Sequence, residues 1–462
     1  MKVKNKSAVF AVAGCALAIV IFVAMLMASV LKTEKSILIK DKNGEVFATV
    51  EWDGVKETFE SDNQFMKTYV AIAFDEAQSV IAKKENVSEN KIKKYVFKNV
   101  TEIRTNFDKG AFLKLKSACE QQGFENTSCE IAISDLNGKL VAVFSVGNKE
   151  NGFELSRNYV GSAIKPLSVF APALESGKYN WSSMIVDSPV SKVQDDEGKM
   201  SDWPVNADGK YTYEPVAIVD SLINSTNTVA VKLLQGVGVS KSMDALEKKY
   251  GFNLDYERQK IESTDETEVL GNIALGYLYN GATVVDMAGN FQPFANGGVY
   301  TKPVAVDEVL DGDKVLYKTE YRSKRFLSES TAEIMNRMLQ LVVQGGTGKN
   351  AKVEGLKVGG KTGTTSGNQD NWFVGFTPDY TCAVWHSFSE KGNVAPDIFA
   401  DVFENVKSEN KVFPHKKGVI SELYCKKSGK LKGENCDNTS RGYYLHNKLP
   451  EICDKCNQEG LS

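Results

Sequence analysis

Ser162 and Lys165 are the residues whose types and spacing best suit nucleophilic catalysis in this sequence. They lie three positions apart where we expect a helix to begin, so their side chains fall on one face. A serine hydroxyl is a weak nucleophile, and a neutral lysine amine can take its proton. Burial or a neighbouring positive charge lowers a lysine pKa, as this role requires. The helix N-terminus adds unpaired backbone N–H groups that favour developing negative charge.

Other chemistries have weaker support. The three histidines, His386, His415 and His446, have no triad-like or ligand-like neighbours, which disfavours a Ser-His-Asp hydrolase or a histidine metal site. The segment GLKVGGKT at 355–362 matches the phosphate-loop pattern, but a strand-like stretch follows it where that loop needs a helix. The 56 Lys and Arg against 59 Asp and Glu give a net charge of −3, so no basic excess points to nucleic acid.

Two further motifs give the serine–lysine pair its context. Ser-x-x-Lys and Ser-x-Asn each recur along the chain, and most copies are typical of solvated turns or caps. Lys-Thr-Gly occurs once, at 361–363, within GGKTGTTS. Serine–lysine at 162–165, Ser225-Thr-Asn227 and Lys361-Thr-Gly, in this order, are the signature of penicillin-binding proteins and active-site serine β-lactamases.

The chain resembles penicillin-binding proteins from Val100 to about Trp385, and its transpeptidase domain is most similar to the bifunctional, class A type. The similarity extends beyond the three motifs. It includes the segments at 159–177 (YVGSAIKPLSVFAPALESG), 213–238, 274–303 (with FANGG) and 345–385 (with NWFVGFTP).

The resemblance implies a role for each motif residue. Ser162 would be the acylated nucleophile and Lys165 its proton acceptor. Ser225 would relay a proton toward the leaving amine, and Asn227 would hold the substrate backbone. Lys361 would supply positive charge near Ser225 and the substrate carboxylate.

The edge strand would bind the substrate through Thr362, Gly363 and Thr364. The backbone N–H groups of Ser162 and Thr364 would form the oxyanion hole, where each donor contributes about 3–4 kcal/mol in such sites. The implied reaction is acyl transfer from peptidoglycan stem peptides ending in D-Ala-D-Ala, with β-lactams as inhibitors. It needs neither a cofactor nor a metal.

We expect an α+β fold of the penicillin-binding-protein and serine β-lactamase type. An antiparallel sheet carrying the Lys361 strand would be covered by helices, with a helical subdomain presenting Ser225 and the nucleophile's helix at their junction. Strand–turn–strand patterns at 36–50 and 130–146 predict two hairpins, and apolar residues at helical spacing predict helices within 64–116.

The N-terminus predicts a single-pass membrane anchor. The uncharged run from Ala8 to Leu31 would form a helix of about 36 Å, enough to cross a hydrocarbon core of about 30 Å. This run is longer than the apolar region of a cleaved signal peptide. The lysines at 2, 4 and 6 place the start in the cytoplasm and the catalytic domain outside.

The expected organisation is therefore a cytoplasmic tail (1–7), an anchor (8–31), a juxtamembrane module (36–99), a transpeptidase domain (100–405) and a cysteine-containing tail (406–462). Class A proteins carry a glycosyltransferase domain between anchor and transpeptidase, and the span from Lys32 to Val100 is too short for one. We therefore expect a separate glycosyltransferase as partner.

The four cysteines of the tail could either bind zinc or form disulfides. Cys425, Cys436, Cys453 and Cys456 would suit tetrahedral zinc, but oxidised pairs are commoner outside the membrane. The segment LYCKKSGKLKGENC is also similar to a tail in many class A proteins, so disulfides and no metal are the expectation. Cys119 and Cys129 could also pair.

Two other functions remain open. Water could be the acyl acceptor, giving a carboxypeptidase or a β-lactamase, although no Glu-activated water motif is evident. The domain could instead be a β-lactam sensor or an inactive scaffold. A sensor would need a cytoplasmic effector, and a scaffold should have lost at least one motif residue, whereas none is lost.

Overall fold

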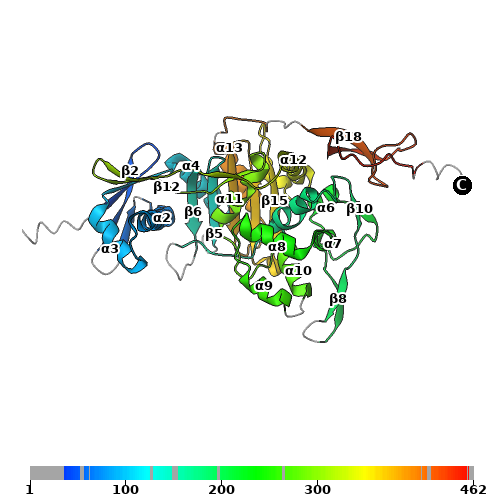
Figure 1. Ribbon diagram of the computed structural model, residues 1–462, viewed down its shortest axis with the longest axis horizontal. Coiled ribbons are helices and arrows are strands. Elements are labelled where there is room, and N and C mark those ends of the chain that lie inside the picture. The colour runs from blue at the N-terminus through cyan, green and yellow to red at the C-terminus, as the bar shows by residue number, and fades with distance from the viewer. Residues whose placement is uncertain are drawn as a thin grey trace, which may run out of the picture.

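The computed structural model describes residues 36–456, except 53–56, 62, 125–127, 148–153, 195–197, 263–265, 407, 414–417 and 455. The tail and anchor expected at 1–7 and 8–31 lie outside the described residues. Within the described ranges, no helix combines the length and apolarity needed to cross a bilayer. The molecule is elongated, with an N-terminal sheet at one end and a C-terminal hairpin at the other (Figure 1).

A five-stranded antiparallel sheet forms the centre of the molecule, in the order β15-β16-β17-β5-β6. The expected hairpin at 130–146 is its β5–β6 pair, and the Lys361 strand, β15, lies at one edge. The strands are β5 (Cys129–Asp135), β6 (Leu140–Val146), β15 (Gly359–Thr364), β16 (Asn371–Phe376) and β17 (Tyr380–His386). The expected antiparallel sheet with the Lys361 strand is therefore confirmed.

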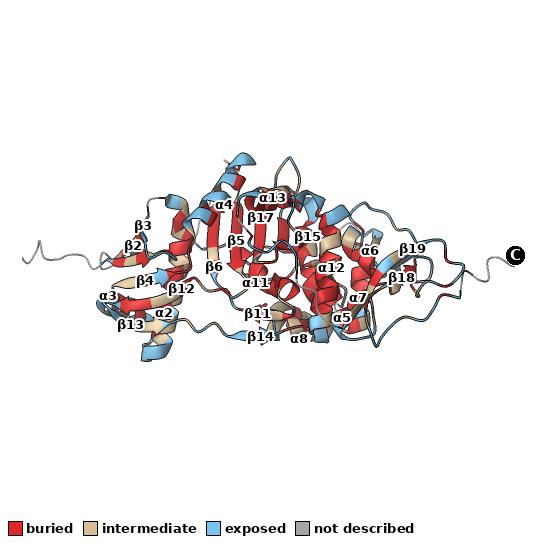
Figure 2. Cartoon of the chain, turned by 90° about the horizontal axis from the view of Figure 1, so that it is seen from above, coloured by how far each residue is buried: buried red, intermediate tan, exposed pale blue. Residues whose placement is uncertain are grey.

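Helices cover both faces of this sheet (Figure 2). On one face lie α4 (Lys109–Gln121) and α13 (Ala395–Asn405), and on the other α11 (Val284–Ala295) and α12 (Glu329–Gly345). Every residue of β16 is buried, as is every residue of β17 but the first. Because both faces are covered, a strand such as NWFVGF is almost wholly apolar.

A helical region lies beyond the β15 edge. It contains short two-stranded ribbons and the helices α6 (Ile218–Asn224), α7 (Asn227–Val237), α8 (Val239–Lys248), α9 (Asp255–Glu262) and α10 (Glu266–Leu275). The ribbons pair β7 (Met184–Val186) with β10 (Pro215–Ala217) and β8 (Ser191–Gln194) with β9 (Met200–Trp203). The segment that carries Ser162 packs against both β15 and α10, at the junction expected from the sequence.

The N-terminal sheet draws strands from both sides of residue 100. Its strand order is β13-β12-β4-β1-β2-β3. The strands are β1 (Ile37–Lys40), β2 (Val46–Trp52), β3 (Glu57–Ser61), β4 (Glu102–Thr105), β12 (Val306–Asp311) and β13 (Lys314–Lys318). Strand β4 pairs with β1 in parallel, and β12 pairs with β4 in the antiparallel direction. The module expected at 36–99 is thus completed by strands from the domain expected at 100–405.

Two helices, α2 (Lys67–Glu85) and α3 (Glu89–Asn99), accompany this sheet. Glu76 on α2 accepts hydrogen bonds from the backbone N–H groups of Ala305 (2.7 Å) and Val306 (3.0 Å), where β12 begins. The Tyr69 hydroxyl donates to Leu140 O on β6 at 2.7 Å. Helix α2 therefore ties the N-terminal sheet to the central one.

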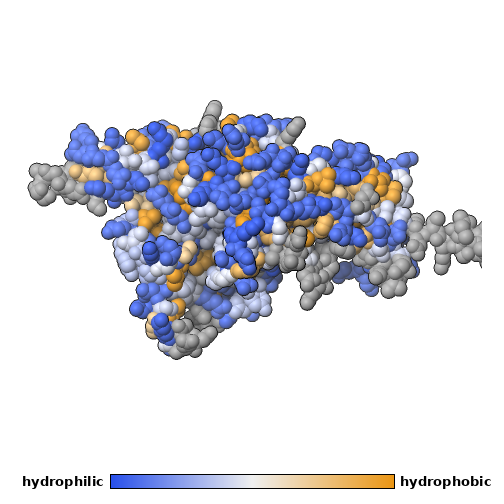
Figure 3. Space-filling model, turned by 180° about the vertical axis from the view of Figure 1, so that it is seen from behind, coloured by the Kyte–Doolittle hydropathy of each residue, from blue (hydrophilic) through white to orange (hydrophobic). Residues whose placement is uncertain are grey.

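The remaining strands lie in a small ribbon and in the tail. A ribbon of β11 (Val299–Thr301) and β14 (Ser323–Arg325) connects α11 to α12, and the tail forms a hairpin of β18 (Val419–Cys425) and β19 (Thr439–Leu445). On the face drawn in Figure 3, hydrophobic residues appear in small separate groups among hydrophilic ones.

Candidate active site

A cleft of about 780 Å³ lies between the β15 edge and the helical region. Five of the eight predicted site residues line it: Ser162, Ser225, Asn227, Thr362 and Thr364. The two predicted lysines are fully buried beneath them, each with 0% exposure. Segments from three distant parts of the sequence thus converge on one site.

Ser162 lies on an unusually wound turn. A 3₁₀ turn spans Gly161–Ile164, a π turn spans Pro166–Phe170, and α5 (Ala171–Glu175) follows. The Lys165 N–H donates to Ser162 O, so one tight turn separates the two residues. Pro166 has no N–H to donate, which suits a point where the winding changes. Such departures from α-helical winding are frequent at functional sites.

Two glycines let this turn touch the edge strand, backbone to backbone. Gly161 has a φ of +52°, and a Cβ there would lie 2.9 Å from Thr364 O and 3.0 Å from Thr364 N. A Cβ on Gly363 would lie 2.3 Å from Val160 O. Gly363 was expected to bind substrate. Its position also explains why Lys-Thr-Gly ends in glycine: any side chain there would collide with the Val160 backbone.

Ser225 sits at the break between α6 and α7 in a left-handed conformation, with φ 60° and ψ 35°. A non-glycine residue adopts this conformation rarely, and such strain clusters at functional sites. The conformation brings both the Ser225 hydroxyl and its carbonyl to the buried lysines.

Lys165 is held by the Ser-x-Asn motif. Its Nζ lies 2.6 Å from Asn227 Oδ1, 2.8 Å from Ser225 O and 3.3 Å from Ser225 Oγ. As a neutral amine, it can donate to the two nearest oxygens and keep its lone pair for a hydroxyl proton. In the described part of the chain, no hydrogen bond joins Lys165 to the Ser162 hydroxyl.

Lys361 approaches the same serine from the edge strand. Its Nζ donates to Ser225 Oγ at 2.9 Å, to Thr362 O at 3.1 Å and to Thr362 Oγ1 at 3.3 Å. The structure therefore brings together the three motifs predicted from sequence.

Burial sets the charge state of both lysines. Loss of hydration lowers the pKa of Lys361 to about 7. Burial, followed by the like charge of Lys361, lowers the pKa of Lys165 well below its ordinary value. Desolvation disfavours a charged amine, and a second amine nearby disfavours it further. The neutral, basic form of Lys165 is thus favoured.

Both the nitrogen and the oxygen of the Asn227 side-chain amide form hydrogen bonds within the protein. Its Nδ2 donates to Val205 O at 2.6 Å, while its Oδ1 accepts from Lys165. Since it was expected to hold the substrate backbone, its position adds a second role, that of orienting Lys165.

A buried polar network positions Asn227, and sequence reasoning missed it. Asn206 Oδ1 accepts from the Asn227 N–H at 2.9 Å, and Asn206 Nδ2 donates to Asp187 Oδ1 at 2.8 Å. Asp187 Oδ1 also accepts from the Thr228 hydroxyl at 2.6 Å. These residues cap the first turn of α7.

Four further polar residues, Thr347, Asn393, Tyr277 and Ser366, line the cleft without having been predicted. The Thr362 hydroxyl donates to Thr347 Oγ1 at 2.8 Å. Asn393 Nδ2 donates to Gly363 O at 3.1 Å and to Thr364 Oγ1 at 3.2 Å. The Tyr277 and Ser366 hydroxyls lie 2.9 Å apart. Thr347, Ser366 and Tyr277 lie in segments that resemble the family, at 345–385 and 274–303, whereas Asn393 lies outside them.

His386 is a core residue. It is fully buried on β17, its Nδ1 lies 2.6 Å from Ser387 O, and its Nε2 accepts from the Val394 N–H at 3.1 Å. Burial lowers its pKa to about 4. It is a neutral core histidine. The phosphate-loop match at 355–362 runs directly into strand β15 and so lacks the helix that loop requires.

Comparisons with known proteins agree with this geometry. A family model described as "Penicillin binding protein transpeptidase domain" matches residues 132–404. The chain is 28% identical over 453 residues to penicillin-binding protein 1A/1B of Bacillus subtilis, covering 87% of this chain and 48% of that protein. It is 30% identical over 296 residues to penicillin-binding protein 1A of Clostridium acetobutylicum, covering 61% and 35%. The chain thus spans less than half the length of these relatives.

Solved structures share the fold. A D,D-transpeptidase domain from Eggerthella lenta has a TM-score of 0.60 at 18% identity, covering 81% of this chain and 98% of that one. An imipenem acyl-enzyme of penicillin-binding protein A from M. tuberculosis has a TM-score of 0.62 at 15% identity, covering 80% and 99%.

Proposed function

The chain belongs to the penicillin-binding protein transpeptidase family, and we propose that it is a membrane-anchored D,D-transpeptidase that cross-links peptidoglycan stem peptides. The observation that carries the proposal is the convergence of Lys165 and Lys361 on the Ser225 hydroxyl, beside the cleft that exposes Ser162. The first step is attack of Ser162 Oγ on the carbonyl of the penultimate D-Ala. Neutral Lys165 takes the hydroxyl proton as the new C–O bond forms.

The oxyanion that develops is stabilised by the backbone N–H groups of Ser162 and Thr364. The close approach of Gly161 to Thr364 supports this assignment, because it brings the two backbones side by side. Preorganised donors of this kind usually supply the largest single contribution to the rate acceleration of such reactions.

Collapse of the intermediate breaks the C–N bond to the terminal D-Ala. Its amine needs a proton, which Ser225 donates while Lys165 replaces the proton on Ser225. The 3.3 Å between Lys165 Nζ and Ser225 Oγ supports this relay. The charge on Lys361 and the Thr362 and Thr364 hydroxyls bind the terminal carboxylate.

In the second step, an amine of a neighbouring stem attacks the Ser162 ester. The same relay, run in reverse, takes the proton of that amine, and Ser162 is released with its own proton. β-Lactams would acylate Ser162 by the first step and block the second.

The composition of the cleft argues against one route to hydrolysis. None of the described residues that line it is Asp or Glu, so no lining carboxylate can activate water. This argues against a β-lactamase that activates water with a glutamate. Retention of all motif residues argues against an inactive scaffold.

The proposal places the catalytic domain outside the cell membrane, anchored by residues 8–31, and makes a separate glycosyltransferase the source of glycan strands. Purified protein with lipid-linked precursor alone should yield no polymer. A separate polymerase added to it should yield cross-linked stems and released D-Ala, both blocked by penicillin. Cross-links that persist with Ser162→Ala would contradict the proposal, as would polymer made by this protein alone.

A further inference from the structure

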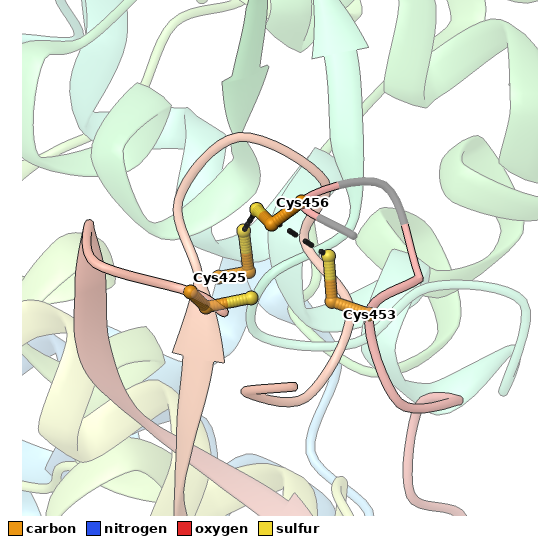
Figure 4. A group of neighbouring side chains, drawn as sticks. Cys425, Cys453 and Cys456 are labelled. Atoms are coloured by element: carbon orange, nitrogen blue, oxygen red, sulfur yellow. Dashed lines mark hydrogen bonds between the residues drawn. The ribbon is translucent and has the colours of Figure 1, made fainter. Parts of the chain in front are cut away.

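The four cysteines of the C-terminal tail gather at one point, although they come from separate segments. Cys425 ends β18, Cys436 lies in the loop before β19, and Cys453 and Cys456 follow β19. All four sulfur atoms lie within 4.8 Å of one another, and three of the four side chains are buried. Figure 4 shows Cys425, Cys453 and Cys456 turned toward one another.

The sulfur spacing differs from that expected from the sequence. Disulfides were predicted, but the four cysteines are separate thiols, with 3.6 Å between the sulfurs of Cys425 and Cys456 and 4.0 Å between those of Cys453 and Cys456. A disulfide bond measures about 2.05 Å. Four sulfurs at about 2.3 Å from a central zinc ion lie about 3.8 Å apart, close to both distances. We therefore propose that Cys425, Cys436, Cys453 and Cys456 bind one structural Zn²⁺.

Donors around the sulfurs fit thiolate ligands. The Gly433 N–H donates to Cys436 Sγ at 3.4 Å, and the Ser428 hydroxyl donates to Cys453 Sγ at 3.1 Å. Gly429 N–H donates to Cys425 O at 2.8 Å, and this residue's φ of +73° closes the turn after the cysteine. Hydrogen bonds of this kind orient metal ligands and stabilise their charge.

Lysines near the cluster supply positive charge, although Lys430 is itself paired with Glu451 and Asp454 at 3.2 Å each. Four thiols lose one proton each on binding, so the zinc–thiolate centre carries two net negative charges. The segment from Cys425 to Cys436 (CKKSGKLKGENC) supplies four lysines. They are Lys426, Lys427, Lys430 and Lys432.

The tail hairpin joins the main core through Tyr424 and Tyr444, and its cysteines form a second, separate cluster. Apart from the main core, the described residues contain one further buried cluster, made of Cys425, Cys436 and Cys453 with Cys456 packed against it. Units below about 40 residues usually need a metal, a disulfide or a partner surface to fold. A metal at this cluster would supply that stabilisation.

The clustered turn is also where the tail rests on the catalytic domain. The Ser182 hydroxyl donates to Gly429 O at 2.6 Å and accepts from the Tyr444 hydroxyl at 2.8 Å. A Cβ on Gly429 would lie 2.3 Å from Ser182 O, so the two backbones touch. The zinc site would therefore fix the surface by which the tail docks beside the helix that follows Ser162.

The first test is metal content. Protein purified without chelator should carry about one zinc ion per chain, and the four tail thiols should resist alkylation until the protein is denatured with chelator. Cys436→Ser should lose the zinc, whereas the matched variant Cys382→Ser, which removes a buried thiol on β17, should keep it. Either of two results would overturn the site: tail disulfides, seen as a mass lower by four hydrogens, or free thiols that take up no added zinc.

A second measurement uses the wild-type chain and does not depend on a variant that folds. Removal of zinc by chelator should expose the tail lysines to trypsin while the catalytic domain stays intact. Added Zn²⁺, but not Mg²⁺, should restore protection. Equal tryptic cleavage of the tail with and without zinc would overturn the structural role.

Discussion

Lys361 Nζ donates to Ser225 Oγ at 2.9 Å, on the same hydroxyl that Lys165 Nζ reaches at 3.3 Å. Two amines that are both fully buried thus share one hydroxyl. Because like charges disfavour each other, they cannot both carry a proton at low cost. We infer that Lys361 holds the charge that binds a carboxylate, while Lys165 holds the lone pair that moves protons.

Lys165→Ala removes the proposed proton acceptor. General-base catalysis contributes about 10²–10⁴-fold, so acylation by penicillin should slow by at least about a hundred-fold. Stopped-flow acylation at neutral pH measures this. Lys232→Ala is the control, because Lys232 is a partly buried lysine on α7 that bonds Val186 O and Ser188 instead. Equal rates for the two variants would contradict the role of Lys165.

The pH profile of acylation should show the lowered pKa of Lys165. A depressed lysine pKa means that the amine becomes neutral at lower pH, so the rate should rise with pH well below the ordinary value of about 10.4. Lys361→Met removes the nearby like charge, so the ascending limb should move to higher pH. A wild-type limb that rises only near pH 10, or one unmoved by Lys361→Met, would count against the account.

Carboxylate recognition should weaken as Lys361 loses its proton. Its pKa of about 7 means that the positive charge is present below that pH and is lost above it. Acylation by a penicillin with a free carboxylate should therefore gain a descending limb near pH 7. The uncharged methyl ester of that penicillin should lack this limb. The same descending limb for both compounds would show that the charge of Lys361 does not bind the carboxylate.

Gly161→Ala should abolish acylation by separating the nucleophile turn from β15. The added Cβ would lie 2.9 Å from Thr364 O, at a φ of +52°. Gly251→Ala is the control, because it has a φ of +73° and nothing within 4 Å of the added Cβ. Both variants carry the backbone strain, and only Gly161→Ala carries the clash. Similar acylation rates would mean that the close approach is not required.

Asn206→Ala should displace Asn227, whose N–H donates to Asn206 Oδ1, and Asn227 in turn orients Lys165. Loss of the helix cap should cost about 1 kcal/mol or more of stability, measured by urea unfolding. Asn253→Ala is the control, because its Oδ1 accepts from the Asp255 N–H at 3.0 Å at the start of α9, away from the cleft. Asn206→Ala alone should slow acylation, with a larger effect on the rate constant than on ligand affinity. Equal acylation by both variants would remove the positioning role.

Much of the site could be predicted from sequence because its motifs are short and local. Ser162 and Lys165 share one turn, Ser225 and Asn227 flank one helix break, and Lys361 occupies a strand of distinctive composition. The alternation and turn signals of β5 and β6 likewise predicted their hairpin correctly.

The supporting contacts could not be predicted, because they join residues far apart in the sequence. Asp187, Asn206 and Asn393 meet the site through loops that have no pattern of their own. The make-up of the N-terminal sheet could not be predicted for the same reason, since its strand β12 returns from residue 306. In the tail, cysteine spacing fits both disulfides and zinc, and only the three-dimensional clustering of the thiols distinguishes them.

The central claim is that Ser162 is the acylated nucleophile, and mass spectrometry after reaction with a β-lactam tests it most directly. The intact mass should rise by a single β-lactam. The adduct should lie on the tryptic peptide 158–178, because trypsin rarely cuts the Lys165-Pro166 bond. Ser162→Ala should abolish the adduct, whereas Ser168→Ala, which removes a buried hydroxyl on the same peptide, should keep it. An adduct that survives Ser162→Ala, or that maps to another residue in the wild type, would contradict the account.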